Sequence, residues 1–120
     1  MYSEIVSEHA CNPRNAGPLD DATHEGVAGV PGDGPYMILW LRVEADTVVS
    51  ASFKTFGCPS AIASGSVTTV LITGRPMSKA ALLTPEGLLL VLGGLPEGKE
   101  YCAKLACDAL QAALKGQLRT

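Results

Sequence analysis

The fold is decided by residues 53–66, which read Phe53-Lys54-Thr55-Phe56-Gly57-Cys58-Pro59-Ser60-Ala61-Ile62-Ala63-Ser64-Gly65-Ser66. This stretch predicts the end of a β-strand, a glycine bend and then a helix of small residues. Proline is tolerated at the first helical position because its missing N–H is not needed there, so Pro59 makes Cys58 the expected N-cap. The free backbone N–H groups of a helix start favour a negative charge and lower the pKa of a thiol beside them. The sequence therefore predicts that Cys58 presents a thiolate at the start of this helix.

Composition limits the classes of protein that fit. The 120 residues predict one domain spanning 1–120, and with 47% apolar but only 5% aromatic residues the core must consist mainly of Ala, Val, Leu and Ile. The net charge is −3 and no basic block occurs, which argues against nucleic acid as a partner. No apolar run reaches about 18 residues and the start lacks a secretory pattern, so we expect a cytoplasmic protein with no membrane contact. Its four cysteines are then expected to be free thiols.

Hydrophobic periodicity predicts the elements around the central stretch. We expect a short helix over 2–10, an antiparallel hairpin of strands 36–43 and 47–53, a helix from Pro59 to about residue 73, and a last helix over 99–114. Residues 18–26 suggest a loop or weak edge strand with a solvated His24, and the glycine-rich segment 26–34 a loop able to approach another backbone closely. Short helical turns should follow residue 77, with Ser78 and Thr84 as N-caps.

Three potential metal ligands follow from this arrangement. Antiparallel pairing puts Asp33, before the first hairpin strand, and Cys58, after the second, at one end of the sheet. Cys102 lies on the core-facing side of the first turn of the last helix, whereas Cys107 falls off its apolar stripe. An Asp33/Cys58/Cys102 metal site is one interpretation. The other is that both cysteines are small buried hydrophobes, since the local zinc-finger spacing is missing. A nucleophilic Cys/His pair is weaker still, because neither histidine has a carboxylate at orienting spacing.

The sequence also carries motifs of a known family. They are Tyr2-Ser3, Asn12-Pro13-Arg14-Asn15 with Gly17, residues 53–58 continuing through Ser60-Ala61-Ile62-Ala63-Ser64, Leu95-Pro96 with Lys99 and Cys102, and Leu105-Ala106 with Ala109-Leu110. On these motifs the chain resembles the IscU/NifU N-terminal family of iron–sulfur cluster assembly scaffolds. The resemblance implies an α+β fold of the SufE/NifU-like kind, with a small antiparallel three-stranded sheet packed against helices. It also implies a scaffold or metal carrier rather than an enzyme.

The resemblance is incomplete at the ligands. The family uses three cysteines, a histidine just before the last cysteine and an aspartate two residues after the first. Cys58 and Cys102 match the second and third cysteines, but Tyr101 stands where the histidine is expected. The first-cysteine motif Cys-Gly-Asp aligns either with Asp33-Gly34-Pro35 or, after a two-residue insertion, with Gly32-Asp33 preceded by Pro31. Both alignments keep Asp33 as the third ligand, for iron, a labile [2Fe–2S] cluster or zinc.

Partners are implied by the same resemblance. A cysteine desulfurase would supply sulfur and apo iron–sulfur proteins would receive the product. The family's Leu-Pro-Pro-Val-Lys segment docks an Hsp70-type chaperone, but here it reads Leu95-Pro96-Glu97-Gly98-Lys99, and the loss of apolar contact and rigidity argues against that docking. Lys54 either pairs with Asp33 or is simply exposed. Two alternatives to the scaffold remain open: a paralogue that binds no cluster and regulates a cysteine desulfurase or scaffold, and a persulfide sulfur carrier.

Overall fold

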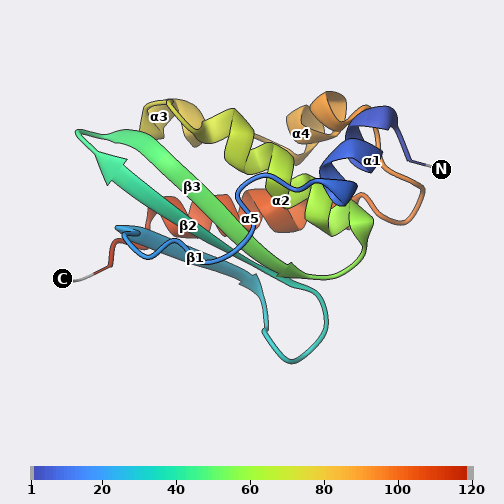
Figure 1. The fold of residues 1–120 in the computed structure, drawn as a ribbon, viewed down its shortest axis with the longest axis horizontal. Helices are drawn as coiled ribbons and strands as arrows, with labels where there is room; N and C mark the ends of the chain where they lie inside the picture. The colour runs from blue at the N-terminus through green and yellow to red at the C-terminus, as the bar shows by residue number, and fades with distance from the viewer. Residues whose placement is uncertain (1, 119–120) are drawn as a thin grey trace.

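The computed structural model describes residues 2–118, in which three antiparallel strands and five helices form an α+β fold, as predicted (Figure 1). Their order is α1 (Glu4–Cys11), β1 (His24–Gly29), β2 (Tyr36–Glu44), β3 (Thr47–Phe56), α2 (Pro59–Ile72), α3 (Met77–Ala80), α4 (Pro85–Leu92) and α5 (Tyr101–Leu114). The sheet order is β1-β2-β3. Helices α2 and α5 cover one face of the sheet, and α1, α3 and α4 lie beyond them (Figure 1). None of the helices in this part of the chain has the length and hydrophobicity that crossing a bilayer requires.

The predicted hairpin is confirmed. β2 and β3 pair from Tyr36 opposite Phe56 to Glu44 opposite Thr47. The two connecting residues, Ala45 and Asp46, have φ values of 49° and 62°. Positive φ at both positions is typical of the tight turn that matches the twist of a two-stranded ribbon. The hairpin therefore brings the end of β3, and with it Cys58, back to the level at which β2 begins.

The glycine-rich segment is corrected in part, because its first four residues belong to β1 rather than to a loop. β1 pairs with β2 from His24 opposite Leu41 to Gly29 opposite Tyr36. A Cβ on Gly26 would lie 2.1 Å from the backbone nitrogen of Ala113, so glycine here lets β1 approach α5 closely. The prediction of a solvated His24 is wrong: its side chain is 7% exposed and its Nδ1 lies 2.8 Å from Oγ1 of Thr23.

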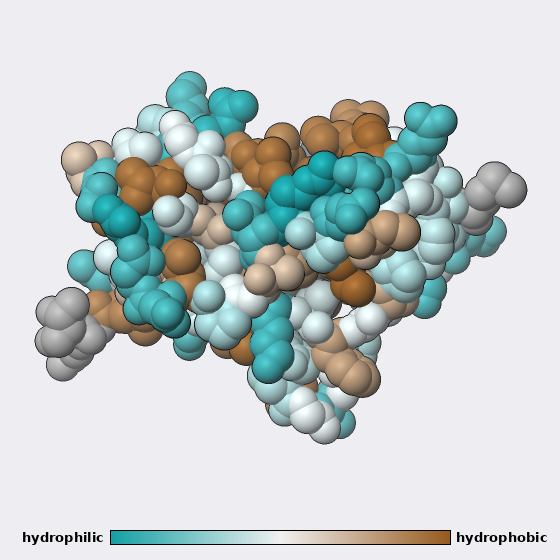
Figure 2. Space-filling model, in the orientation of Figure 1, coloured by the Kyte–Doolittle hydropathy of each residue, from teal (hydrophilic) through white to brown (hydrophobic). Residues whose placement is uncertain are grey.

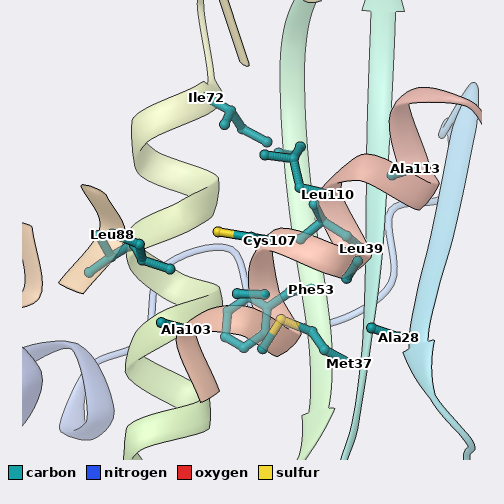
Figure 3. Packing of buried hydrophobic residues seen from close by; sticks show 14 of the residues in the cluster. Ala28, Met37, Leu39, Phe53, Ile72, Leu88, Ala103, Cys107, Leu110 and Ala113 are labelled. Carbon is teal, nitrogen blue, oxygen red and sulfur yellow. The ribbon is translucent and has the colours of Figure 1, made fainter. Parts of the chain in front are cut away.

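The core lies between the inner face of the sheet and helices α2 and α5. Figure 3 shows Phe53 between these layers and Cys107 pointing from α5 towards α2. The prediction that Cys107 lies off the buried stripe is wrong, since the residue is 3% exposed. Helix α5 packs against the sheet on one side and against α2 and α4 on the other, so more than one stripe of it is buried. Alanines at its contact positions permit this close packing.

Helix α2 carries five buried hydroxyl side chains, and two of them, Ser66 and Thr69, form hydrogen bonds to the N-terminal segment. Oγ of Ser66 lies 2.7 Å from Nδ1 of His9 and accepts a hydrogen bond of 2.8 Å from the backbone N–H of Arg14. Nδ2 of Asn15 donates to Oγ1 of Thr69 at 3.0 Å. Because each buried hydroxyl without a partner is costly, these contacts fix how α1 and the following segment lie on α2.

The helix termini agree with the sequence at most positions. Thr84 is the N-cap of α4 and accepts from the N–H of Gly87 at 3.0 Å, and Gly93 ends that helix in the left-handed conformation. Ser78 is not an N-cap, because α3 begins one residue before it with Pro76 in that role. Helix α5 begins at Tyr101, two residues later than expected.

Gly65 lets α2 rest directly on the sheet, and this contact can be tested. A Cβ there would lie 2.5 Å from Cδ2 of the buried Phe53 ring. We expect Gly65→Ala to lower the free energy of unfolding by about 1–3 kcal/mol, because overpacking outweighs the gain in helix propensity. Urea denaturation measures the change.

The matched control is Gly87→Ala in α4, where the added Cβ would meet only Oγ1 of Thr84 at 3.2 Å. This variant should leave stability unchanged or raise it by up to about 1 kcal/mol. If both substitutions had the same effect, close packing at Gly65 would not be the cause.

Candidate functional site

Cys58 stands at the start of α2, where the sequence predicted it. β3 ends at Phe56, Gly57 forms the bend, and Cys58 is the N-cap, with Pro59 as the first helical residue. Its backbone is extended, with φ −87° and ψ 177°, and no side-chain bond caps the helix. The Cys58 side chain is half-buried, so its sulfur can be reached from solvent. The free N–H groups of the first turn are therefore available to that sulfur.

Cys102 approaches the same point from another helix. It is the second residue of α5 and has no exposed surface. Its thiol lies close enough to the Cys58 thiol and to the Tyr101 phenol for these groups to shift one another's pKa. The starts of α2 and α5 thus bring two sulfurs and one phenol oxygen together. The sequence predicted Cys102 as an inward-facing residue at a helix start, and the structure confirms that placement.

The surroundings of the two thiols shift their pKa values in opposite directions. Burial disfavours ionisation of Cys58, but the backbone N–H groups of Ala61 and Ser60, together with the side chains of Cys102 and Ser60, outweigh it, so the pKa of this thiol is lowered. Burial, and then the charge of Cys58, raise the pKa of Cys102 to about 11. The pKa of Tyr101 is raised, first by the charge of Cys102 and then by its hydrogen bond. In the metal-free pair, Cys58 is the thiol that ionises first.

Ser60 is a member of this site to which sequence reasoning gave no role. Its side chain is fully buried, and apart from the neighbouring Cys58 sulfur its hydroxyl has no partner among residues 2–118. Ser60 is the second residue of α2, immediately after Pro59. A hydroxyl residue two positions after a capping cysteine, within the first turn of the helix, is the sequence signal that could have identified it.

Asp33 lies on the loop between β1 and β2, at the same end of the sheet as Cys58. The register sets Gly29 opposite Tyr36 and Tyr36 opposite Phe56, as antiparallel pairing predicted. Asp33 is exposed, and its N–H donates to the carbonyl of Val30 at 2.9 Å. Figure 1 shows this loop projecting beyond the sheet.

The structure brings Cys58 and Cys102 together and leaves Asp33 apart from them. Across residues 2–118, no three His, Cys, Asp or Glu side chains gather closely enough to hold a metal ion. Coordination by Asp33 therefore stays a prediction. The glycines that flank it, Gly32 and Gly34, have φ values of 89° and 91°, and a Cβ on either would have no atom within 4 Å. The surroundings of these two glycines are thus open.

The remaining predicted site residues lie around this centre. Lys54 is exposed on β3 and forms no ion pair within the described part of the chain, so its pairing with Asp33 is not observed. Leu95 is half-buried against the core, and the N–H of Lys99 donates to the carbonyl of Pro96 at 2.9 Å. The segment 95–99 is therefore an ordered turn that leads into α5.

Comparison with known proteins places this geometry in context. Residues 1–119 match the family described as the NifU-like N terminal domain. The chain is 38% identical to an iron–sulfur cluster assembly scaffold protein, IscU 1, of Archaeoglobus fulgidus, over 99% of this chain and 78% of that protein. It is 41% identical to the scaffold protein IscU of Aquifex aeolicus, over 98% and 76%. It is also 43% identical to a protein of Drosophila melanogaster named iron–sulfur cluster assembly enzyme IscU, over 95% and 76%.

Solved structures share the fold. A protein of Fervidobacterium islandicum, described as an iron–sulfur cluster assembly scaffold for the SUF system, superimposes with a TM-score of 0.75 at 20% identity. The alignment covers 94% of this chain and 96% of the other. At that identity the likeness concerns the fold alone.

The opposite pKa shifts of Cys58 and Cys102 predict the order in which the two thiols react with an alkylating agent. In metal-free Cys11→Ser protein, which lacks the exposed thiol of α1, iodoacetamide should modify Cys58 at lower pH than Cys102. A thiol with a lowered pKa is largely thiolate at a pH where one with a raised pKa is still protonated, and the thiolate is the reactive form. Mass spectrometry of the peptides at each pH gives the two profiles.

Ser60→Ala is the internal check, because it removes one donor to Cys58 and should move the Cys58 profile to higher pH. Modification of Cys102 before Cys58 would contradict the assignment.

Proposed function

This chain belongs to the family of NifU-like N-terminal domains, and we propose that it acts as a scaffold on which an iron–sulfur cluster is assembled and from which it is passed on. The observation that carries the proposal is the meeting of Cys58 and Cys102 at the starts of two helices. Thiolates are the ligands that iron–sulfur clusters prefer. Two converging helix N-termini favour the negative charge that such a thiolate site carries.

We propose Cys58 and Cys102 as the sulfur ligands and Asp33 as the third protein ligand. Support for Asp33 comes from its position at the same end of the sheet and from the open surroundings of its loop. A carboxylate is a harder donor than a thiolate, so iron or a [2Fe–2S] cluster would be held less tightly than by three cysteines. Zinc accepts Asp, Cys, Cys and a water molecule, and it is the competing occupant in purified protein.

The function is that of a carrier rather than a catalyst. The cluster is cargo, and the half-buried Cys58 leaves it accessible to a protein that receives it. A cysteine desulfurase is the proposed source of sulfur, and apo iron–sulfur proteins are the proposed recipients. An Hsp70-type chaperone fits less well, because Glu97 and Gly98 remove apolar contact from the segment that would dock it. Four free thiols are in keeping with action in the reducing cytoplasm.

Persulfide carriage is a second function that one observation favours. The lowered pKa of Cys58 makes it a nucleophile able to attack the outer sulfur of a desulfurase persulfide. The sulfur–sulfur bond of the donor breaks, a new one forms at Cys58, and the donor cysteine leaves as a thiolate, with no net oxidation. A paralogue that holds nothing and only regulates a desulfurase is the remaining alternative, and metal content separates it from the scaffold.

Anaerobic reconstitution with iron and sulfide tests the ligand set. The wild-type chain and Cys11→Ser should gain iron and visible absorbance, whereas Cys58→Ser and Cys102→Ser should lose at least about tenfold in affinity, since each removes a thiolate. Asp33→Asn should still load, but should release iron to a chelator roughly tenfold faster than wild type.

Each outcome of this experiment decides a different point. Wild-type protein without metal and without absorbance would overturn the scaffold proposal. Unchanged release from Asp33→Asn would remove Asp33 from the ligand set and leave the two cysteines in place.

Incubation with a cysteine desulfurase and cysteine tests persulfide carriage. The intact chain should gain the mass of one sulfur on the peptide that contains Cys58, because this thiol ionises more readily than Cys102. Cys58→Ser should abolish the gain and Asp33→Asn should retain it. A gain on Cys102 alone would contradict the assignment of the acceptor.

A further inference from the structure

An apolar groove lies at the other end of α2 from the cysteines. The last turn of α2, together with α3 and α4, encloses a groove of about 330 Å³. Its apolar lining consists of Leu71, Ile72, Ala80, Leu82, Leu83 and Val91. Leu82 is 69% exposed and Val91 41% exposed, and neither is covered by another part of the described chain. Figure 2 shows hydrophobic surface gathered over α2 and α4 along the upper edge of the view.

The groove is bordered by positive charge. Arg75 and Lys79 line it, and no acidic residue does. Nε of Arg75 donates to the carbonyl of Leu71 at 2.8 Å, which holds the guanidinium at the rim. Within residues 2–118 neither cation takes part in an ion pair. The chain as a whole has a charge of −3, so this rim is opposite in sign to the rest of the molecule.

The groove and the cysteine pair can be occupied at the same time. Cys58 precedes the first residue of α2, and Ile72 is its last. At 1.5 Å per residue these ends are about 20 Å apart. An element of modest size bound in the groove would therefore leave the sulfurs open to metal and to other partners.

We propose that this groove docks an amphipathic helix of a partner protein, with aliphatic side chains on its buried face and Asp or Glu along its flanks. A cleft between neighbouring helices accepts a third helix by the packing that builds helical bundles, and burial of Leu82 and Val91 supplies the apolar contribution. Arg75 and Lys79 then meet the acidic flanks, and this charge complementarity selects the partner and speeds its approach. The proposal does not depend on what the cysteines hold.

Fluorescence anisotropy with a synthetic peptide tests the chemistry. The probe is a labelled helical peptide of about 18 residues, with Leu at positions i, i+3, i+4 and i+7 and Glu on both flanks; its comparator carries Lys in place of Glu. The intact chain should bind the Glu peptide at least about tenfold more tightly than the Lys peptide. Arg75→Glu combined with Lys79→Glu should reverse that preference, and Leu82→Gln should weaken both peptides.

Leu90→Gln is the matched control, because Leu90 lies on α4, is 83% exposed and does not line the groove. It should leave both affinities unchanged, and all these variants should take up iron as the wild type does. Equal affinity for the two peptides, or equal losses from Leu82→Gln and Leu90→Gln, would overturn the proposal. Self-association of the chain in sedimentation equilibrium that Leu82→Gln removes would also overturn it, by assigning the groove to a second copy.

Discussion

The close approach of α2 and α5 to the sheet is the constraint on which the rest of the structure depends. Gly65 allows α2 to rest on the Phe53 ring, and Gly26 allows β1 to touch the backbone of α5. With only 5% aromatic residues, the chain fills its core by bringing small side chains close rather than by inserting large ones. The depth at which the two helices lie fixes where they begin, and so sets the Cys58 thiol against the Cys102 thiol.

Local patterns were enough to predict the hairpin, the N-cap at Cys58, and the N-cap of α4 at Thr84. Each depends on neighbours in sequence: a tight turn between apolar runs, or a proline after a capping residue. His24 and Cys107 could not be placed in this way, because their burial depends on what packs over them from elsewhere. The carbonyl of Gly116, just after α5, accepts a hydrogen bond from the N–H of Glu25 beside His24, and the Cys107 side chain points towards α2.

For the candidate site, too, features set by neighbours in sequence could be predicted, and features set by tertiary packing could not. Helix starts could be located to within about two residues from sequence, so both cysteines were identified as thiols at helix N-termini. Their opposite pKa shifts could not be identified, because these arise from the mutual contact and from unequal burial. Cys58, whose pKa is lowered, is the sulfur of the pair that loses its proton first, and Cys102, whose pKa is raised to about 11, keeps its proton over a wider pH range.

The loop that carries Asp33 lies outside the packed core, and residues 30–35 are exposed. It projects beyond the sheet, and the glycines on either side of Asp33 have space around them. Substitution of the exposed Asp33 side chain is therefore expected to cost little folding free energy, whereas changes near Cys58 disturb a helix start packed against the core. Under the proposed ligand set, this loop is where the strength with which iron is held would be adjusted, because a carboxylate is a harder donor than a thiolate and holds iron less tightly.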